Sequence, residues 1–287
     1  MVFGRVFGRF FVGPHLGLQN GDDTPDTSTL SELVETYDFW PEVVRQLPGR
    51  TKQLYTMFET SDVHPDVITN MKVFDRVLVP VQYLCDILVR HGVNAVSLNF
   101  YTSDLIRERH TVIPKTLDPA RIIFLYVGTN DARKNLTTLT RAFARLGGSH
   151  VLIAKTNKSD GLAVSPNIKV ITGRIENTKL AALYNMCDYV ISATRGEGVG
   201  LPMLEADYFR KPIVAHDQGV FRDVRGLVSV PWHVVPSTEI PISYEGVPGF
   251  LHKVFWGTWW DLSEDELLGT LMKICYNKDG YGNRGDC

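Results

Sequence analysis

The sequence is organised around the stretch Thr194-Arg-Gly-Glu-Gly-Val-Gly-Leu-Pro-Met-Leu-Glu-Ala206. An apolar run at residues 189–193 precedes it and predicts a strand, and a helix is predicted to follow over residues 202–210, where a proline suits the first turn. Glu197 falls on the loop between these elements, and Glu205 falls eight positions later, in the first turns of the helix. The glycines between the two glutamates let the backbone approach a ligand without a Cβ in the way.

The start of this predicted helix is suited to an anion. Its unpaired N–H groups and the positive end of its dipole favour a phosphate. Two carboxylates beside an anion site, those of Glu197 and Glu205, fit a ligand that also carries hydroxyl groups. The stretch therefore predicts a site for a sugar joined to a nucleoside diphosphate, with the phosphates at the helix end, one glutamate on the sugar hydroxyls and the other on a ribose.

This stretch resembles the Glu-x7-Glu motif of the retaining glycosyltransferases of the GT-B fold, a family 4-like group (glycosyl transferases group 1) that includes sucrose synthases and bacterial mannosyltransferases. The resemblance extends from about residue 121 to residue 223. It implies an α/β chain of two Rossmann-like domains whose parallel sheets face a cleft, and transfer of a sugar to an acceptor hydroxyl with its anomeric configuration retained. It also implies that Glu197 holds the sugar, that Glu205 holds the ribose, and that the donor contacts Gly198, Val199, Gly200 and Leu201.

A second cluster follows the apolar run at residues 121–127, which predicts a central strand buried on both faces. The run ends at Gly128-Thr-Asn-Asp-Ala-Arg-Lys-Asn135, so Arg133 and Lys134 lie at the carboxyl end of a strand, where open α/β sheets bind ligands. Two cations at a helix start oppose its dipole, and an anionic ligand explains them better than solvation does. The loop resembles the phosphate-binding loop of the same family. The resemblance implies that Gly128 contacts the donor and that Arg133 and Lys134, with Glu197, act in catalysis by stabilising the departing diphosphate and the sugar.

The remaining donor residues follow later strands. By resemblance the backbone at Arg174 and Ile175, after the strand predicted for residues 168–172, frames the nucleobase. His216 ends the strand predicted for residues 211–216 and fits a sugar contact or a structural role equally well. No Asp-x-Asp metal signature is present in the sequence, so we expect a UDP- or GDP-sugar as co-substrate, with no cofactor and no metal requirement.

The N-terminal part alternates predicted strands and helices between residues 52 and 98, which argues for a parallel sheet with covering helices. We place a short acceptor-side Rossmann-like domain at residues 1–117, the donor-binding Rossmann-like domain at residues 118–270, and the end of the last helix with a tail at residues 271–287. Residues that the resemblance places on the acceptor side are His15, Gly17, Glu59 and His64. An ordinary turn explains the first two equally well, and His64, directly before a proline, also fits a helix start.

Composition sets further bounds. The chain has 30 Lys and Arg against 32 Asp and Glu, a net charge of −2, which predicts no strong nonspecific attraction to nucleic acid or to an anionic membrane. Four widely spaced cysteines indicate reduced thiols in a cytoplasmic compartment rather than a zinc site. The apolar residues 1–12 are interrupted by glycine and arginine, so they predict a buried first strand rather than a targeting segment, and no transmembrane run follows.

Other functions stay open on the sequence alone. A hydrolase or epimerase of the same fold acts on the same donor, and a noncatalytic nucleotide-sugar binding protein needs only the donor site. The acceptor of a transferase is a glycan, a lipid-linked or small molecule, or a modified DNA base, as for viral DNA glycosyltransferases. A basic cleft for DNA would come from Arg5, Arg9, Arg45, Arg50 and Lys52. The sugar, the nucleobase and the oligomeric state are not encoded in a motif.

Overall fold

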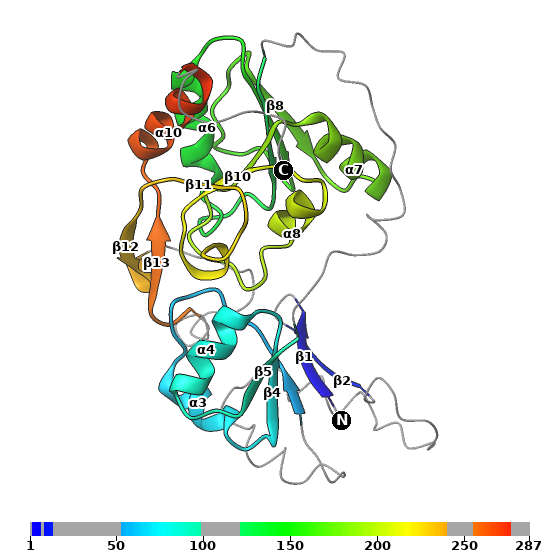
Figure 1. The fold of residues 1–287 in the computed structure, drawn as a ribbon, viewed down its shortest axis with the longest axis vertical. Coiled ribbons are helices and arrows are strands. Elements are labelled where there is room, and N and C mark those ends of the chain that lie inside the picture. Colours follow the sequence, from blue (N-terminus) through cyan, green and yellow to red (C-terminus); the bar gives the residue numbers. More distant parts are fainter. Residues whose placement is uncertain (1, 7–8, 14–52, 99–120, 240–254, 277–287) are drawn as a thin grey trace. The chain divides into compact units, whose positions relative to one another are not determined.

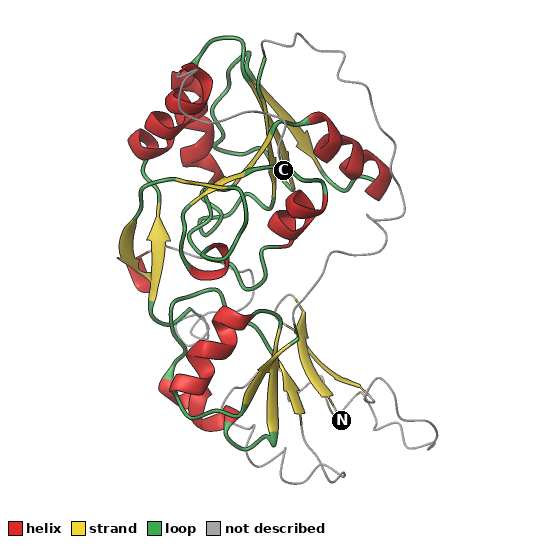
Figure 2. Cartoon of the chain, viewed as in Figure 1, coloured by secondary structure: helices red, strands yellow, loops and turns green. Residues whose placement is uncertain are grey.

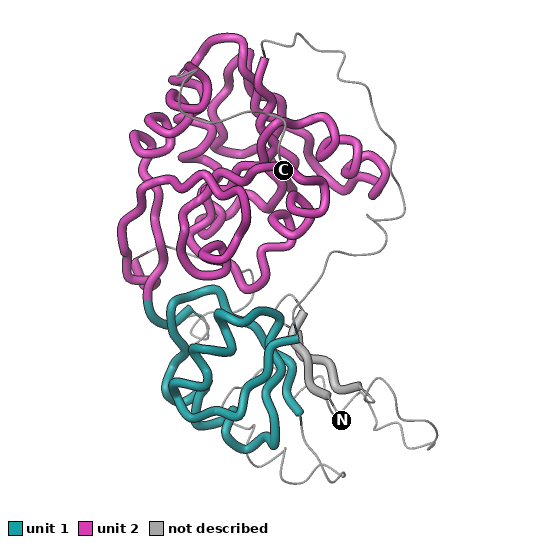
Figure 3. Tube along the Cα trace, viewed as in Figure 1, with its two compact units in different colours: residues 1–100, 246–257 teal, residues 101–245, 258–287 magenta. Residues whose placement is uncertain are grey.

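The computed structural model describes residues 2–6, 9–13, 53–98, 121–239 and 255–276 (Figure 1). The chain divides into two compact units, residues 1–100 with 246–257 (unit 1) and residues 101–245 with 258–287 (unit 2) (Figure 3). The domain boundary predicted at residues 117–118 lies outside the described residues, as do most of the C-terminal tail and the His15–Gly17 turn, so these predictions stand as they were made.

Unit 2 is built on a six-stranded, fully parallel sheet in the order β11-β10-β9-β6-β7-β8 (Figures 1 and 2). Its strands are β6 (Ile123–Val127), β7 (Val151–Thr156), β8 (Ile168–Thr172), β9 (Tyr189–Ile191), β10 (Ile213–Ala215) and β11 (Leu227–Ser229). The chain builds outward from β6 to β8 and then returns to place β9 on the other side of β6. This is the strand order of a Rossmann sheet, and the loops that follow β6 and β9 diverge at its switch point, where such sheets bind ligands.

Helices cover both faces of this sheet (Figure 2). They are α6 (Leu136–Leu146), α7 (Asn177–Met186), α8 (Leu201–Tyr208) and α10 (Glu264–Tyr276), with short 3₁₀ turns η1 (Gly219–Phe221) and η2 (Ser237–Glu239). Side chains of β6 alternate between two cores: Phe124 and Tyr126 belong to the one that includes α6 and α10, and Ile123 and Leu125 to the one that includes α7 and α8. Because both faces are buried, the strand reads as a continuous apolar run, as predicted.

Unit 1 holds a second sheet, in the order β2-β1-β3-β4-β5. Its strands are β1 (Val2–Val6), β2 (Arg9–Gly13), β3 (Gln53–Tyr55), β4 (Arg76–Val79) and β5 (Ala95–Ser97), and its helices are α3 (Pro65–Met71) and α4 (Gln82–Arg90). All neighbouring strands pair parallel except β1 and β2. The alternation of strands and helices predicted after residue 52 is confirmed.

The expectation of a single first strand is wrong. Residues 2–6 and 9–13 form two strands that pair antiparallel, with Val6 opposite Arg9. The apolar pattern of the segment is the same for one strand or two, which is why the sequence did not separate them.

One pair of strands was not predicted. β12 (His233–Pro236) and β13 (Thr258–Asp261) form an antiparallel pair in unit 2, although 21 residues separate them in the chain. Trp259 and Trp260 on β13 are buried, so they act in packing. Among the described residues, Cys85, Cys187 and Cys275 take part in no disulfide bond. Within the described ranges, no helix has the length and apolar character needed to span a bilayer.

Candidate active site

Two loops meet at the switch point of the unit 2 sheet: the cationic loop, residues 128–135 after β6, and the glutamate loop, residues 192–200 after β9. Lys134 Nζ donates a short hydrogen bond to Glu197 Oε1, and Arg133 Nη1 lies 3.5 Å from Glu197 Oε2. Arg133 Nη1 also donates to the carbonyl of Gly196 at 2.7 Å. The three residues predicted to be catalytic thus lie in direct contact. Since β6 and β9 are neighbours only in the folded sheet, this proximity comes from the strand order.

These side chains are largely withdrawn from water, with exposures of 8% for Arg133, 12% for Lys134 and 10% for Glu197. Burial alone would raise the pKa of Glu197, but the charges of Lys134 and Arg133 and the hydrogen bonds from Lys134 and Thr194 outweigh it and hold that pKa below its ordinary value. The carboxylate is therefore ionised at neutral pH. Two cations against one carboxylate leave a net positive charge, which suits an anionic ligand.

The N-terminal end of α8, beside this cluster, has backbone N–H groups without a partner in the described part of the protein. α8 begins at Leu201, after Gly200 with φ of +73°, a left-handed conformation that glycine adopts without strain. Within the described ranges, the N–H groups of Gly198, Val199, Gly200 and Leu201 donate no hydrogen bond to the protein. A Cβ at position 200 would lie 3.4 Å from Val220, an ordinary van der Waals distance, so the backbone conformation rather than space favours glycine there. The unpaired N–H groups at the start of α8 match the predicted phosphate position.

Glu205, on α8, has a partner that sequence reasoning did not find. Tyr184 of α7 donates a hydrogen bond from its hydroxyl to Glu205 Oε2 at 2.6 Å, and the same hydroxyl lies 3.3 Å from the carbonyl oxygen of Pro202. Burial raises the pKa of Glu205, and the bond from Tyr184 offsets part of that rise. Tyr184 stacks on Phe209 with ring centroids 5.3 Å apart. In the sequence, Tyr184 lies in an apolar stripe at helical spacing with Leu180 and Leu183, and that spacing carries no signal of the hydroxyl's role.

The other predicted donor residues occupy the same edge of the sheet. Gly128 follows β6, where a Cβ would lie 2.8 Å from the hydroxyl of Tyr126, so a larger residue there would force that side chain to shift. Arg174 is exposed and Ile175 half-buried, and both follow β8, which is separated from β6 by β7. No contact joins these two residues to Arg133, Lys134 or Glu197 among those the structure gives. Their donor roles stay predictions.

His216, at the carboxyl end of β10, is a packed and neutral histidine. Its exposure is 1%, its Nδ1 accepts from the N–H of Gln218 at 3.2 Å, and its ring lies against Phe221 and Trp260 at 4.8 and 5.6 Å. Burial lowers its pKa to about 4, although the Thr194 backbone and the Glu197 charge act in the opposite direction. These contacts account for His216 as a structural residue, which was one of its two predicted roles.

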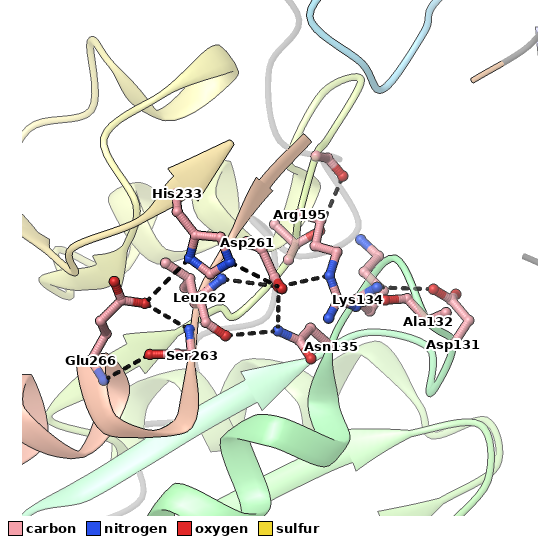
Figure 4. Close-up of polar contacts among 12 residues, drawn as sticks. Asp131, Ala132, Lys134, Asn135, Arg195, His233, Asp261, Leu262, Ser263 and Glu266 are labelled. Carbon is pink, nitrogen blue, oxygen red and sulfur yellow. Dashed lines mark hydrogen bonds and ion pairs between the residues drawn. The ribbon is translucent and has the colours of Figure 1, made fainter. Parts of the chain in front are cut away.

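A group of polar contacts centred on Asp261 connects residues of the two loops (Figure 4). Asp261, the last residue of β13, accepts hydrogen bonds at Oδ1 from Arg195 Nε at 2.7 Å and from Asn135 Nδ2 at 3.2 Å. Arg195 belongs to the glutamate loop and Asn135 ends the cationic loop. Asp261 is absent from the residues predicted for the site. No local pattern points to it, because its partners are 66 and 126 residues away.

Of the residues predicted for the acceptor side, two are described and both belong to unit 1. His64 caps α3, since its Nδ1 accepts from the N–H of Asp66 at 3.1 Å. This confirms the helix-start alternative, and its ring also lies edge-on to Trp256 at 4.5 Å. Glu59 is half-buried after β3. An acceptor role for either residue remains a prediction. Across the described residues, no three His, Cys, Asp or Glu side chains gather as metal ligands.

Comparison with known proteins agrees with this geometry. Residues 111–227 match the family described as glycosyl transferases group 1. This range includes both loops of the site. The matched residues make up less than half of the chain. No curated protein sequence matches the chain.

Solved structures with the GT-B fold resemble it as well. A sucrose-phosphate synthase from Thermosynechococcus elongatus matches with a TM-score of 0.50 and 16% identity, over 66% of this chain and 57% of that one. A UDP-forming α,α-trehalose-phosphate synthase from Burkholderia xenovorans matches with a TM-score of 0.50 and 12% identity, over 78% of this chain and 60% of that one. The predicted GT-B class is confirmed, and the chain spans less than two thirds of either enzyme.

Proposed function

We propose that the chain is a retaining glycosyltransferase, which moves a sugar from a nucleoside-diphosphate sugar to an acceptor hydroxyl. The observation that carries the proposal is the buried cluster of Arg133, Lys134 and Glu197 at the switch point of a group 1 domain. A buried cluster with excess positive charge requires a reason, because removing cations from water is costly. A diphosphate supplies that reason.

The reaction breaks the bond between the anomeric carbon and a phosphate oxygen, while positive charge develops on the sugar. Arg133 and Lys134 stabilise the negative charge that collects on the departing diphosphate, together with the N–H groups at the start of α8. The acceptor oxygen bonds to the anomeric carbon on the face that the phosphate leaves, and its proton passes to the departing phosphate. Configuration is thereby retained.

Neither glutamate is placed as a covalent nucleophile in this scheme. Double displacement requires two carboxyl groups about 5 Å apart across the scissile bond. Glu197 is instead directed to Lys134 and Arg133, and Glu205 to Tyr184. We assign Glu197 to the sugar hydroxyls and Glu205 to the ribose, with Gly128, Arg174 and Ile175 along the nucleotide. The donor is a UDP- or GDP-sugar in a metal-independent, cytoplasmic reaction, and the acceptor is a glycan, a lipid-linked or small molecule, or a modified nucleic acid.

Calorimetric titration tests the donor site. Wild-type protein is titrated with UDP, GDP and ADP, alone and as sugar conjugates, beside the Arg133→Ala/Lys134→Ala and Glu205→Ala variants. Arg222→Ala is the matched control, because Arg222 is an exposed cation of the same unit, paired with Asp223. We expect one nucleotide to bind to the wild type and the control and to lose affinity in both site variants.

The outcomes separate the alternatives. Binding with equal affinity in the site variants would refute the assigned roles. Binding without turnover across an acceptor panel would favour a noncatalytic nucleotide-sugar binding protein, and rapid release of free sugar without acceptor would favour a hydrolase.

A further inference from the structure

Asp261 holds two residues that flank the proposed catalytic groups. Its Oδ1 accepts from Arg195, two residues before Glu197, and from Asn135, the residue after Lys134. It also accepts the backbone N–H of its neighbour Leu262 at 3.0 Å. One carboxylate oxygen thus lies between the two loops that carry the proposed catalytic groups (Figure 4).

Backbone contacts extend the same connection. The N–H of Trp260 donates to the carbonyl of Arg195 at 3.0 Å, and the N–H of Arg195 donates to the carbonyl of Arg133 at 2.8 Å. Asn135 Nδ2 also lies 3.2 Å from the carbonyl oxygen of Leu262, and Arg195 Nη1 makes a short bond to the carbonyl of Ala132. Residues 260–262 therefore form a seam with both loops, with Asp261 at its centre.

The Asp261–Arg195 pair is largely buried, so breaking it is costly. Asp261 is 18% exposed and Arg195 is 12% exposed, so neither charge has full access to water if the pair is broken. Asn135 has φ of +53°, a left-handed conformation that asparagine tolerates better than most residues. The side-chain amide of Asn135 donates both to Asp261 Oδ1 and to the carbonyl of Leu262. Loss of the Asp261 carboxylate would therefore remove one contact from each loop at the same time, while the backbone bond from Arg195 to Arg133 remains.

We propose that Asp261 is a positioning residue that couples the cationic loop to the glutamate loop, so that Arg133, Lys134 and Glu197 keep one arrangement when a donor binds. This inference rests on the proposed function. The outer oxygen of Asp261 faces His233, 3.7 Å away, and His233 in turn lies 3.8 Å from Glu266. These outer contacts do not reach the loops, so Asp261 acts on the loops through Oδ1 and adds to the direct bonds from Arg195 to Arg133 and Ala132.

The test is hydrogen exchange of backbone amides in Asp261→Asn, which keeps an acceptor oxygen and removes the charge that Arg195 requires. We expect exchange to become faster by roughly tenfold or more in both residues 131–135 and residues 194–197. Asp265→Asn is the matched control. It makes the same chemical change in an exposed ion pair with Arg145, outside the seam, and should leave both loops unchanged.

Nucleotide affinity supplies a second readout. Asp261→Asn should weaken the nucleotide that the wild type binds by roughly ten- to a hundredfold, since displaced catalytic groups lose their alignment. Asp261→Glu keeps the charge but displaces it by one methylene, so it should keep the fold and still lose affinity. If Asp261→Asn does not fold, Asp261→Glu and Arg195→Met carry the exchange test.

Three results for Asp261→Asn would overturn the proposal. The first is faster exchange in only one loop, and the second is unchanged exchange in both. The third is a lowered melting temperature together with nucleotide affinity equal to that of the wild type, measured at temperatures where the variant is folded. Failure of the wild type to bind any nucleotide would refute the proposed function instead. The exchange comparison would then still decide whether Asp261 couples the loops.

Discussion

At the carboxyl ends of the strands in unit 2, polar side chains pair with partners far away in the chain, whereas in unit 1 they pair with closer ones. Lys134 and Glu197 are 63 residues apart, and Asn135 and Asp261 are 126 apart. His64, by contrast, caps its own helix, and its neighbour Asp62 pairs with His91 only 29 residues away.

Exposure differs in the same direction. The Lys134–Glu197 pair is 12% and 10% exposed, and the His91–Asp62 pair is 37% and 42% exposed. Ion pairs near water contribute little to stability, while withdrawn ones are costly to break. The difference indicates that unit 2 holds a preorganised charge arrangement, and that the described part of unit 1 uses its polar residues mainly for local structure.

The largest effect is expected for substitution of Lys134, which tests whether the charges of unit 2 are preorganised for catalysis. Lys134→Met leaves Glu197 with Arg133 as its remaining cation and removes one stabilising charge from the departing diphosphate. We expect kcat to fall by about 10²–10³, the loss found when one preorganised electrostatic contact is removed. Steady-state kinetics on the donor identified by calorimetry checks this. Lys179→Met, an exposed lysine of α7, is the control, and a fall below tenfold would contradict the role of Lys134.

A smaller effect is expected at His216, through pH. Its pKa is about 4 in the folded protein against an ordinary value of 6.5, so between these values the unfolded chain takes up a proton that the folded chain does not. Stability from this group is complete above pH 6.5 and is lost as the pH falls toward 4, by at most about 3 kcal/mol.

Urea unfolding across this pH range measures the effect. His216→Gln removes the titrating group, so its free energy of unfolding should change less with pH than that of the wild type. Equal slopes in the two proteins would show that His216 is not buried as neutral imidazole. His233→Gln, at an exposed histidine, is the matched control.

Tyr184→Phe tests the polar pairing in unit 2 by removing a single oxygen atom. The change removes the hydroxyl that holds Glu205 and leaves the stacking on Phe209 in place. We expect nucleotide affinity to fall by a few-fold to about tenfold, in line with about 1 kcal/mol for one hydrogen bond. Calorimetry measures it, with Tyr208→Phe on the neighbouring helix as control. Unchanged affinity would separate Glu205 from the nucleotide site.

The smallest effect is expected in unit 1. His64→Ala removes the cap of α3 and should lower the free energy of unfolding by about 1 kcal/mol, while His64→Asn restores a capping side chain and most of that stability. Nucleotide affinity should not change in either variant. If His64→Ala retains wild-type stability but loses transferase activity, the capping role is secondary and the acceptor role predicted from the sequence gains support.

The sequence by itself determined most of the order of the elements and which residue types lie on the two loops. The apolar run before Gly128 and the glycine at position 147, with φ of +61°, bracket a strand and helix close to the observed β6 and α6. These signals are local, because periodicity and helix-ending glycines act within a few residues. The placement of Arg133, Lys134 and Glu197 on loops at strand ends was predictable for the same reason.

Only the tertiary structure decided which loops meet and what holds them. β6 and β9 become neighbours through the strand order, and β13 brings Asp261 to both loops from the end of the domain. The hairpin of β1 and β2, the β12–β13 pair and the Tyr184–Glu205 bond escaped prediction as well. Each depends on pairing between separate segments, whose side chains show the same local pattern whether or not the partner is present.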